Sequence, residues 1–161
     1  MDDAQDIERL AGAYEIARMT LNIPHPYPQG AAVKWLKQMM QQDEPRGYTF
    51  AVLLHDQTFI GMCGIHPHER FSRAEIGYWM GVAYWGKGYM SEAARRVLQF
   101  GFEELNLRRI QATYLTENPA SRRVMEKIGM TYEGILRSYV QKDGEDKDLG
   151  MCAIVRGEWE S

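Results

Sequence analysis

The stretch Tyr84-Trp85-Gly86-Lys87-Gly88-Tyr89-Met90-Ser91-Glu92-Ala93 lies between a strand-like run over residues 74–82 and a helix-like run over residues 91–105. Two glycines at a strand-to-helix turn let the backbone come close to a ligand, because glycine has no Cβ atom. The N–H groups of a helix's first turn have no partner within the helix, and they favour an anion. The stretch therefore predicts a phosphate or pyrophosphate site, and the spacing alone leaves an ordinary turn open as the alternative.

Two well-known phosphate motifs do not fit this stretch. The third glycine of the dinucleotide fingerprint G-x-G-x-x-G is missing, because Gly86-Lys87-Gly88 continues as Tyr89-Met90-Ser91. The Gly-Lys-Ser/Thr of a P-loop is missing as well.

The stretch instead resembles the acetyl-CoA pyrophosphate loop of the GNAT superfamily of N-acetyltransferases, Q/R-x-x-G-x-G/A, aligned on residues 85–90. Gly88 matches a defining position, while Trp85 stands at the Gln/Arg position and Met90 at the Gly/Ala position. Tyr-Trp-Gly-Lys-Gly-Tyr with Glu-Ala close behind resembles the ribosomal-protein-alanine (Rim-type) branch. The resemblance implies acetyl-CoA as cosubstrate. It implies that acetyl-CoA is contacted by Met80, Gly81, Val82, Trp85, Gly86, Lys87, Gly88, Tyr89, Met90, Ser91 and Asn118.

Composition sets broad limits on the function. The 161 residues suit one domain, expected over residues 1–161, and the net charge of −3 with no basic run argues against nucleic acid as a partner. We expect no membrane segment and a cytoplasmic protein, with Cys63 and Cys152 as buried free thiols. We expect no metal, because the pair His66 and His68 lacks a third ligand nearby.

The first part of the chain predicts two helices, over residues 4–19 and 31–42, separated by a loop with three prolines. The apolar face of the second helix is expected to comprise Ala32, Trp35, Leu36, Met39 and Met40. His25 and Tyr27 are the polar tips of the loop. The loop is a rigid connector or a binding element. The resemblance implies that it lines the acceptor-amine side of the cleft, which would make His25 and Tyr27 substrate-binding.

The middle of the chain predicts three strands, over residues 48–55, 58–66 and 74–82, with a loop at 66–70. Gly77 and Gly81 in the third strand suggest a bulge or a close approach of another backbone or ligand. A helix over residues 91–105 follows, and Gly101 within it hints at tight packing against the sheet.

The last part predicts a strand over residues 108–116 and a short helix that begins at Asn118-Pro119. A hairpin over residues 131–140 and 150–155 then turns at Asp143-Gly144. The fold class is α/β or α+β with a mixed sheet. The resemblance implies a mostly antiparallel GNAT sheet flanked by helices, here without the family's first strand. An uncovered sheet edge makes a homodimer plausible.

Amine acetylation requires a binding site for acetyl-CoA, a donor to the thioester carbonyl and a base for the attacking ammonium. A splayed or bulged strand over residues 77–82 would supply a backbone N–H to the carbonyl oxygen. Glu75 is the candidate base, because a partly buried carboxylate has a raised pKa. Its Ala74-Glu75-Ile76 context also resembles part of the superfamily. A solvent-facing Glu75, Glu133 as base, and water as base remain alternatives.

Many GNAT enzymes use a tyrosine in the short helix to protonate the CoA thiolate, but Met125 stands at that position here. Ser121 completes an Asn-x-x-Ser element that resembles the Rim-type branch, where this serine lies close to the CoA sulfur. Ser121 is therefore the candidate acid, and an ordinary first-turn helix residue is the alternative. A thiolate with a pKa of about 8 to 9 can also leave without a dedicated acid.

The sequence therefore predicts an acetyl-CoA-dependent N-acetyltransferase that acetylates a primary amine by direct attack on the thioester. The acceptors that the resemblance leaves open are peptide N-termini, polyamines and other small amines. A non-catalytic acyl-CoA-binding regulatory module on the same fold is the first alternative. A nucleotide-binding structural domain is the second.

Overall fold

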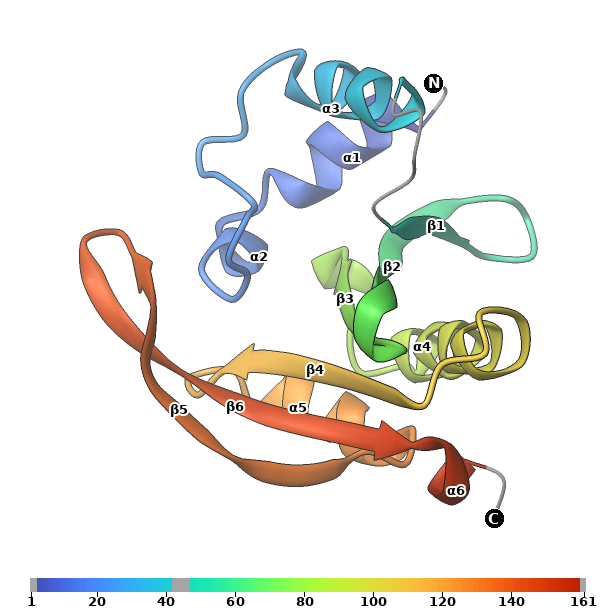
Figure 1. Ribbon diagram of the computed structural model, residues 1–161. Helices are drawn as coiled ribbons and strands as arrows, with labels where there is room; N and C mark the ends of the chain where they lie inside the picture. The colour runs from blue at the N-terminus through green and yellow to red at the C-terminus, as the bar shows by residue number, and fades with distance from the viewer. Residues whose placement is uncertain (1–2, 42–46, 160–161) are drawn as a thin grey trace.

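A computed structural model of the chain describes residues 3–41 and 47–159 (Figure 1). The N-terminal part forms α1 (Ala4–Ala11), α2 (Tyr14–Ala17) and α3 (Ala31–Met40). The middle part forms β1 (Tyr48–Leu53), β2 (Phe59–His68), β3 (Arg73–Met80) and α4 (Tyr89–Gln99). The C-terminal part forms β4 (Arg109–Leu115), α5 (Pro119–Lys127), β5 (Thr131–Lys142), β6 (Glu145–Val155) and α6 (Arg156–Trp159).

The six strands form one sheet in the order β1-β2-β3-β4-β6-β5. Every neighbouring pair is antiparallel except β3 and β4, which are parallel. The predicted mixed, mostly antiparallel sheet is therefore confirmed.

Two apolar clusters cover the two faces of the sheet. The larger one packs α4 and α5 against the sheet, with Leu98, Phe102 and Met125 among its most buried side chains. The smaller one packs α1 and α3 against β2 and β3. Figure 1 shows α1 and α3 on one side of the sheet and α4 and α5 on the other.

The pairing of β3 with β4 is unusually short. It covers Arg73 to Glu75 on β3 and Arg109 to Gln111 on β4, after which the two strands diverge. On its other edge, β3 stays paired with β2 up to Met80 without any shift in register. The predicted bulge at the glycines of β3 is therefore wrong, and the predicted splaying of this strand is confirmed.

Close backbone approach occurs at a glycine of β2 instead. A Cβ atom added at Gly61 would meet Trp79 O and lie 2.9 Å from Met80 Cα. Gly101 behaves as predicted, because an added Cβ would lie 2.6 Å from Ile110 Cδ1 and 2.8 Å from Ile65 Cδ1. Gly61 thus lets β3 come close to β2 within the sheet, and Gly101 lets the helix layer come close to the sheet.

The predicted helix over residues 4–19 is wrong in its extent. Gly12 ends α1 and Ala13 has an extended backbone with ψ of 130°, so α2 begins in a new direction. Tyr14, the first residue of α2, is exposed. On α3, Ala32 is buried as expected, but Met40 is 73% exposed because it lies in the helix's last turn, away from the cluster.

Other boundaries differ by a few residues. α4 begins at Tyr89, two residues earlier than predicted, because Gly88 is its N-cap and has a left-handed backbone. The last turn of the predicted helix is a π-helix, η3 (Phe100–Glu104). β2 continues to His68 through part of the predicted loop. The hairpin turn is confirmed at Asp143 and Gly144, which both have positive φ, but β6 begins at Glu145.

Cys63 and Cys152 are buried and form no disulfide, as expected. Within residues 3–41 and 47–159, no helix is long and apolar enough to span a membrane.

We expect Gly61→Ala to lower the free energy of unfolding by about 2 kcal/mol, because the new methyl group must displace the backbone of β3. Urea denaturation of the two proteins measures the change. Gly77→Ala on β3 is the control, since its added Cβ would meet nothing within 4 Å. Equal stability of the Gly61 variant and the wild-type protein would contradict this account of the close approach.

Candidate active site

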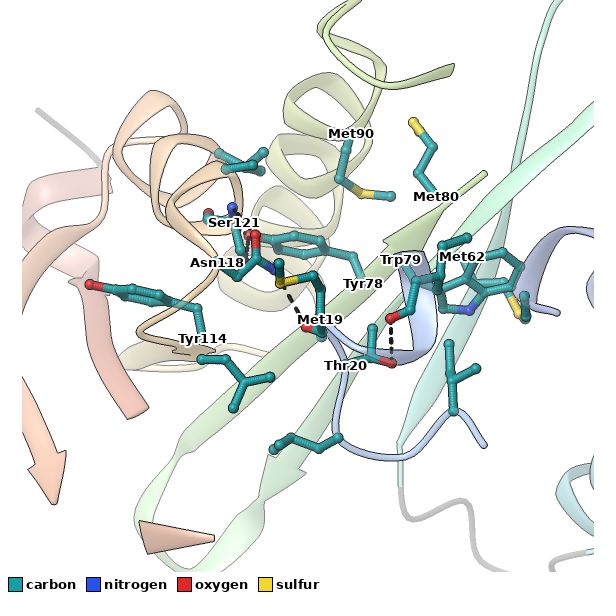
Figure 2. Close-up of a pocket in the computed structure, with 18 of the residues that line it drawn as sticks. Met19, Thr20, Met62, Tyr78, Trp79, Met80, Met90, Tyr114, Asn118 and Ser121 are labelled. Atoms are coloured by element: carbon teal, nitrogen blue, oxygen red, sulfur yellow. Dashed lines mark hydrogen bonds between the residues drawn. The ribbon is translucent and has the colours of Figure 1, made fainter. Parts of the chain in front are cut away.

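A cleft of about 1190 Å³ runs through the opening between β3 and β4. Its lining comes from both layers: residues of α1, α3 and the segment between them, strands β2, β3 and β4, the N-terminal part of α4, and α5. Figure 2 shows side chains from these elements around the opening, with Tyr78, Asn118 and Ser121 on one side and Met62 and Trp79 on the other.

The glycine loop forms one end of the cleft. Gly86 and Gly88 have φ of +73° and +83°, and a Cβ added at either would meet nothing within 4 Å. Gly88 is the N-cap of α4, and no side chain caps this end. The first-turn N–H groups of α4 are therefore available to an anion.

The loop is fixed to the end of β3 by the indole N–H of Trp85, which donates to Met80 O at 2.7 Å. The lining of the cleft includes Met80, Trp85, Gly86, Gly88, Tyr89, Met90, Ser91 and Asn118 of the predicted acetyl-CoA contacts. It does not include Gly81, Val82 or Lys87. Gly81 faces Leu10 of α1 instead, and the Lys87 ammonium lies 5.9 Å from the centre of the Tyr84 ring.

The edge of β3 that faces the opening can be assigned from strand alternation. Gly81 N–H donates to Ile60 O on β2 at 2.9 Å, so the backbone groups of Gly77, Trp79 and Gly81 face β2. The backbone groups of Tyr78 and Met80 consequently face β4, which has diverged from β3 at this height. Within residues 77–82, the N–H groups of Tyr78 and Met80 are thus the ones directed into the opening.

Glu75 lies on the face of β3 opposite to Tyr78 and lines the cleft. Its side chain is exposed, so the expected partial burial is wrong. Gln111 Nε2 and Thr113 Oγ1, both on β4, donate to the two carboxylate oxygens at 3.3 Å. The carboxylate is therefore oriented by two neutral donors while remaining accessible to water and to a ligand.

Glu133, the reserve candidate for the base, does not line the cleft. Arg109 donates to both of its carboxylate oxygens, at 2.7 and 2.6 Å. This hydrogen-bonded guanidinium lowers the pKa of Glu133, so the carboxylate is a weaker base than a free one. Glu133 is therefore outside the cleft and held by Arg109, which leaves Glu75 as the better-placed candidate for the base.

Asn118 and Ser121 meet at the start of α5. Asn118 Oδ1 accepts a hydrogen bond from Ser121 N–H at 3.2 Å, with Pro119 in the first turn, so the predicted helix cap is confirmed. Asn118 Nδ2 also donates to Met19 O at 3.4 Å, across the cleft. Met125, which replaces the family's tyrosine, is a buried core residue.

Tyr78 is a polar group of the site that the sequence analysis missed. Its hydroxyl donates to Ser121 O at 2.9 Å and lies 3.0 Å from Ser121 Oγ. Burial raises the pKa of Tyr78, so the phenol stays protonated at ordinary pH. The sequence could have indicated this residue. Tyr78 is three residues after Glu75 on the same strand, so its side chain must lie on the opposite face of the sheet.

Of the two residues of the proline loop that were predicted to bind the substrate, one lies in the cleft. Tyr27 lines the cleft, and burial together with the nearby Glu8 carboxylate raises the pKa of its phenol. His25 does not line the cleft, because its ring packs edge-on against Tyr14 with centroids 5.2 Å apart. His66 also lines the cleft, but residues 3–41 and 47–159 contain no group of three side chains able to hold a metal ion.

Comparison with known proteins gives consistent matches. Residues 1–131 match the family model of the acetyltransferase (GNAT) domain. The uncharacterized N-acetyltransferase YnaD of Bacillus subtilis is 41% identical over 111 residues, which cover 68% of this chain and 65% of YnaD. The uncharacterized N-acetyltransferase p20 of Bacillus licheniformis is 34% identical over 118 residues, which cover 72% of this chain and 66% of p20. The matches thus span just under two thirds of these relatives.

Among solved structures, RimJ of Mycobacterium smegmatis in complex with CoA-disulfide has a TM-score of 0.87 and 27% identity. The superposition covers 99% of this chain and 80% of RimJ.

Asn118→Ala removes the cap of α5, and we expect the free energy of unfolding to fall by about 1 kcal/mol. Asn118→Ser keeps an oxygen acceptor for Ser121 N–H and, like Ala, lacks the donor to Met19 O, so it should recover much of this loss. Urea denaturation compares the variants. If Ser destabilised the protein as much as Ala, the capping oxygen would not be the group that stabilises α5.

Proposed function

The chain belongs to the acetyltransferase (GNAT) family, and from this premise we propose that it transfers the acetyl group of acetyl-CoA to a primary amine. One observation carries the proposal. A single cleft joins an uncapped helix N-terminus at one end to a carboxylate on the opposite face of the sheet, through a gap between two strands. Acetyl-CoA, which is anionic, and the amine that accepts the acetyl group, which is cationic, can therefore reach the same gap from opposite faces of the sheet.

Acetyl-CoA would enter from the α4 side. The backbone of residues 86–91 would hold the pyrophosphate, because no side chain caps the N-terminus of α4 and two glycines leave room for the oxygens. The pantetheine arm would follow the open edge of β3 toward Tyr78. RimJ of Mycobacterium smegmatis, which is similar over most of this chain, was solved in complex with CoA-disulfide, and this supports a CoA thioester as the donor.

In the reaction, the amine nitrogen would attack the thioester carbonyl carbon. A C–N bond forms, the C–S bond breaks, and the CoA thiolate leaves. Negative charge develops on the carbonyl oxygen, where the N–H of Tyr78 or Met80 can stabilise it because both are directed into the gap. Such donors act without reorganisation, since the strand that carries them is held by β2 along its whole length.

The acceptor is an ammonium ion at neutral pH, because amine pKa values lie at roughly 8 to 10. It must lose a proton before the attack. Glu75 is the proposed base, acting directly or through a water molecule, with Gln111 and Thr113 fixing its orientation. Its negative charge would also attract the cationic acceptor.

Ser121 is the proposed donor of a proton to the leaving thiolate, with Tyr78 as the group that orients it. The Tyr78 proton can go to Ser121 O or to Ser121 Oγ. When the Tyr78 hydroxyl donates to Ser121 Oγ, the serine O–H is free to donate to the sulfur. The nitrogen loses its second proton as the amide forms, and this proton would reach Ser121 Oγ through water while the serine proton passes to the thiolate. Serine and phenol therefore both end neutral. Among acceptors, peptide N-termini, polyamines and other small amines all present the required primary amine.

Calorimetric titration with acetyl-CoA, NAD and ATP, followed by thiol release with a panel of amines, tests the proposal. Selective binding of acetyl-CoA and amine-dependent thiol release are expected. Binding without turnover would favour a non-catalytic acyl-CoA-binding module, and absence of binding by folded protein would contradict both functions.

We expect Gly88→Ala to weaken acetyl-CoA binding about tenfold. At positive φ an alanine is strained by roughly 1–2 kcal/mol, and its methyl group would occupy the space proposed for the pyrophosphate. Gly144→Ala is the matched control. It imposes the same strain at φ of +79° in the β5–β6 turn, which does not line the cleft. Calorimetry should find the loss only in the Gly88 variant, and equal affinities of the two variants would contradict the assignment.

Glu75→Gln should lower kcat/KM for the amine by about 100-fold and leave the Kd for acetyl-CoA unchanged, because it removes the base but not the donor site. Glu133→Gln is the control, since this carboxylate pairs with Arg109 outside the cleft. Steady-state kinetics at several pH values gives the comparison. A Glu75 variant with wild-type turnover would exclude Glu75 as the base.

A further inference from the structure

The segment over residues 16–24, named here the acceptor wall, forms one side of the cleft. Eight of its nine residues line it: Ile16, Arg18, Met19, Thr20, Leu21, Asn22, Ile23 and Pro24. Beyond the last turn of α2, these residues form no regular helix or strand, and most of their side chains are not buried. Packing alone therefore fixes the wall weakly, so its position depends on tethers from other elements.

One tether comes from the far end of the chain. Lys142 Nζ donates to Ala17 O at 2.9 Å and to Thr20 O at 2.7 Å. Lys142 is the last residue of β5, next to the hairpin turn, and it is half-buried. In Figure 1, the tip of the β5–β6 hairpin curves away from the body of the sheet and reaches α2.

The chemistry of this contact suits the end of a helix. Ala17 is the last residue of α2, and the local donors to its carbonyl oxygen are distant, with Thr20 N–H at 3.4 Å and Thr20 Oγ1 at 3.5 Å. A cation there is favourable, and an ammonium group has three donors. Thr20 Oγ1 donates back to Ile16 O at 2.9 Å, so the turn that Lys142 holds is also closed on itself.

A second tether holds the wall from the side of the proposed acid. Asn118 Nδ2 donates to Met19 O, while Asn118 Oδ1 caps α5 at Ser121 N–H. Met19 lies beside Asn118 and Tyr78 in Figure 2. The acceptor wall is thus held by two tethers, Lys142 and Asn118. Asn118 lines the cleft, and Lys142 does not.

We propose that Lys142 is a positioning residue for the amine acceptor: its ammonium group holds the acceptor wall at the distance from the β3–β4 opening that the amine requires. The proposal rests on the proposed function. It assigns to the C-terminal hairpin a role in acceptor binding, without any contact between Lys142 and the reacting groups.

The test compares Lys142→Met with wild-type protein, because methionine keeps most of the apolar stem and removes the donors. We expect the KM for a turned-over amine to rise about tenfold, the scale of losing charge-assisted hydrogen bonds. The KM for acetyl-CoA should stay within about twofold, since the α4 end is untouched. Lys142→Arg should recover at least half of the lost affinity on a logarithmic scale.

Lys147→Met is the matched control. Lys147 lies on the same hairpin but pairs with Glu117 at 3.0 Å and Glu145 at 2.8 Å, and it does not line the cleft. A general weakening of the hairpin would affect both variants alike. An unchanged amine KM in Lys142→Met, an equal rise in Lys147→Met, or an equal rise in both KM values would overturn the proposal.

Hydrogen–deuterium exchange separates this proposal from the proposed function, because it needs no turnover. In substrate-free protein, the amides of Arg18, Met19 and Thr20 should exchange faster in Lys142→Met than in wild type or Lys147→Met. Unchanged exchange would overturn the tether itself. Faster exchange in a protein that acetylates no amine would uphold the tether while refuting the proposed function and, with it, the assigned role in acceptor binding.

Discussion

The early end of the pairing between β3 and β4 is the constraint on which the rest of the structure depends. Each strand is fully paired on its other edge: β3 with β2 as far as Met80, and β4 with β6 from Arg109 to Leu115. The two halves of the sheet can therefore separate without either strand losing its support. Backbone polar groups exposed at the gap need a partner, and a bound ligand can supply one.

The chain between the diverging strands places charge at the two ends of the gap. The crossover from β3 to β4 passes through α4, so the helix N-terminus follows directly after the strand whose edge is open. Alternation along β3 then directs Glu75 to one face and Tyr78 to the other. The N-terminus of α4 and a carboxylate are thus set on opposite sides of one opening by a single strand and a short loop.

Local signals were sufficient for most of the fold. Gly86 and Gly88 before an amphipathic run, Asn118-Pro119, and Asp143-Gly144 each determine local backbone geometry, and the structure has a turn or helix start at each. The break at Gly12–Ala13 was not predictable in this way, because helical spacing continues through it and tertiary packing decides where the helix ends.

The site was less predictable than the fold, because its geometry comes from contacts distant in sequence. Tyr78 reaches Ser121 over 43 positions, and Lys142 reaches Thr20 over 122 positions. Neither residue stands in a recognisable motif. Glu133 and His25 show the converse: both are suitable residue types in suitable segments, but Arg109 and Tyr14 respectively hold them elsewhere.

A crystal structure of the protein with acetyl-CoA tests the central claim most directly. The account predicts the pyrophosphate against the backbone of residues 86–91, the pantetheine arm between β3 and β4, and the thioester oxygen within hydrogen-bond distance of the N–H of Tyr78 or Met80. Acetyl-CoA bound outside the gap, or a thioester oxygen remote from the edge of β3, would contradict it.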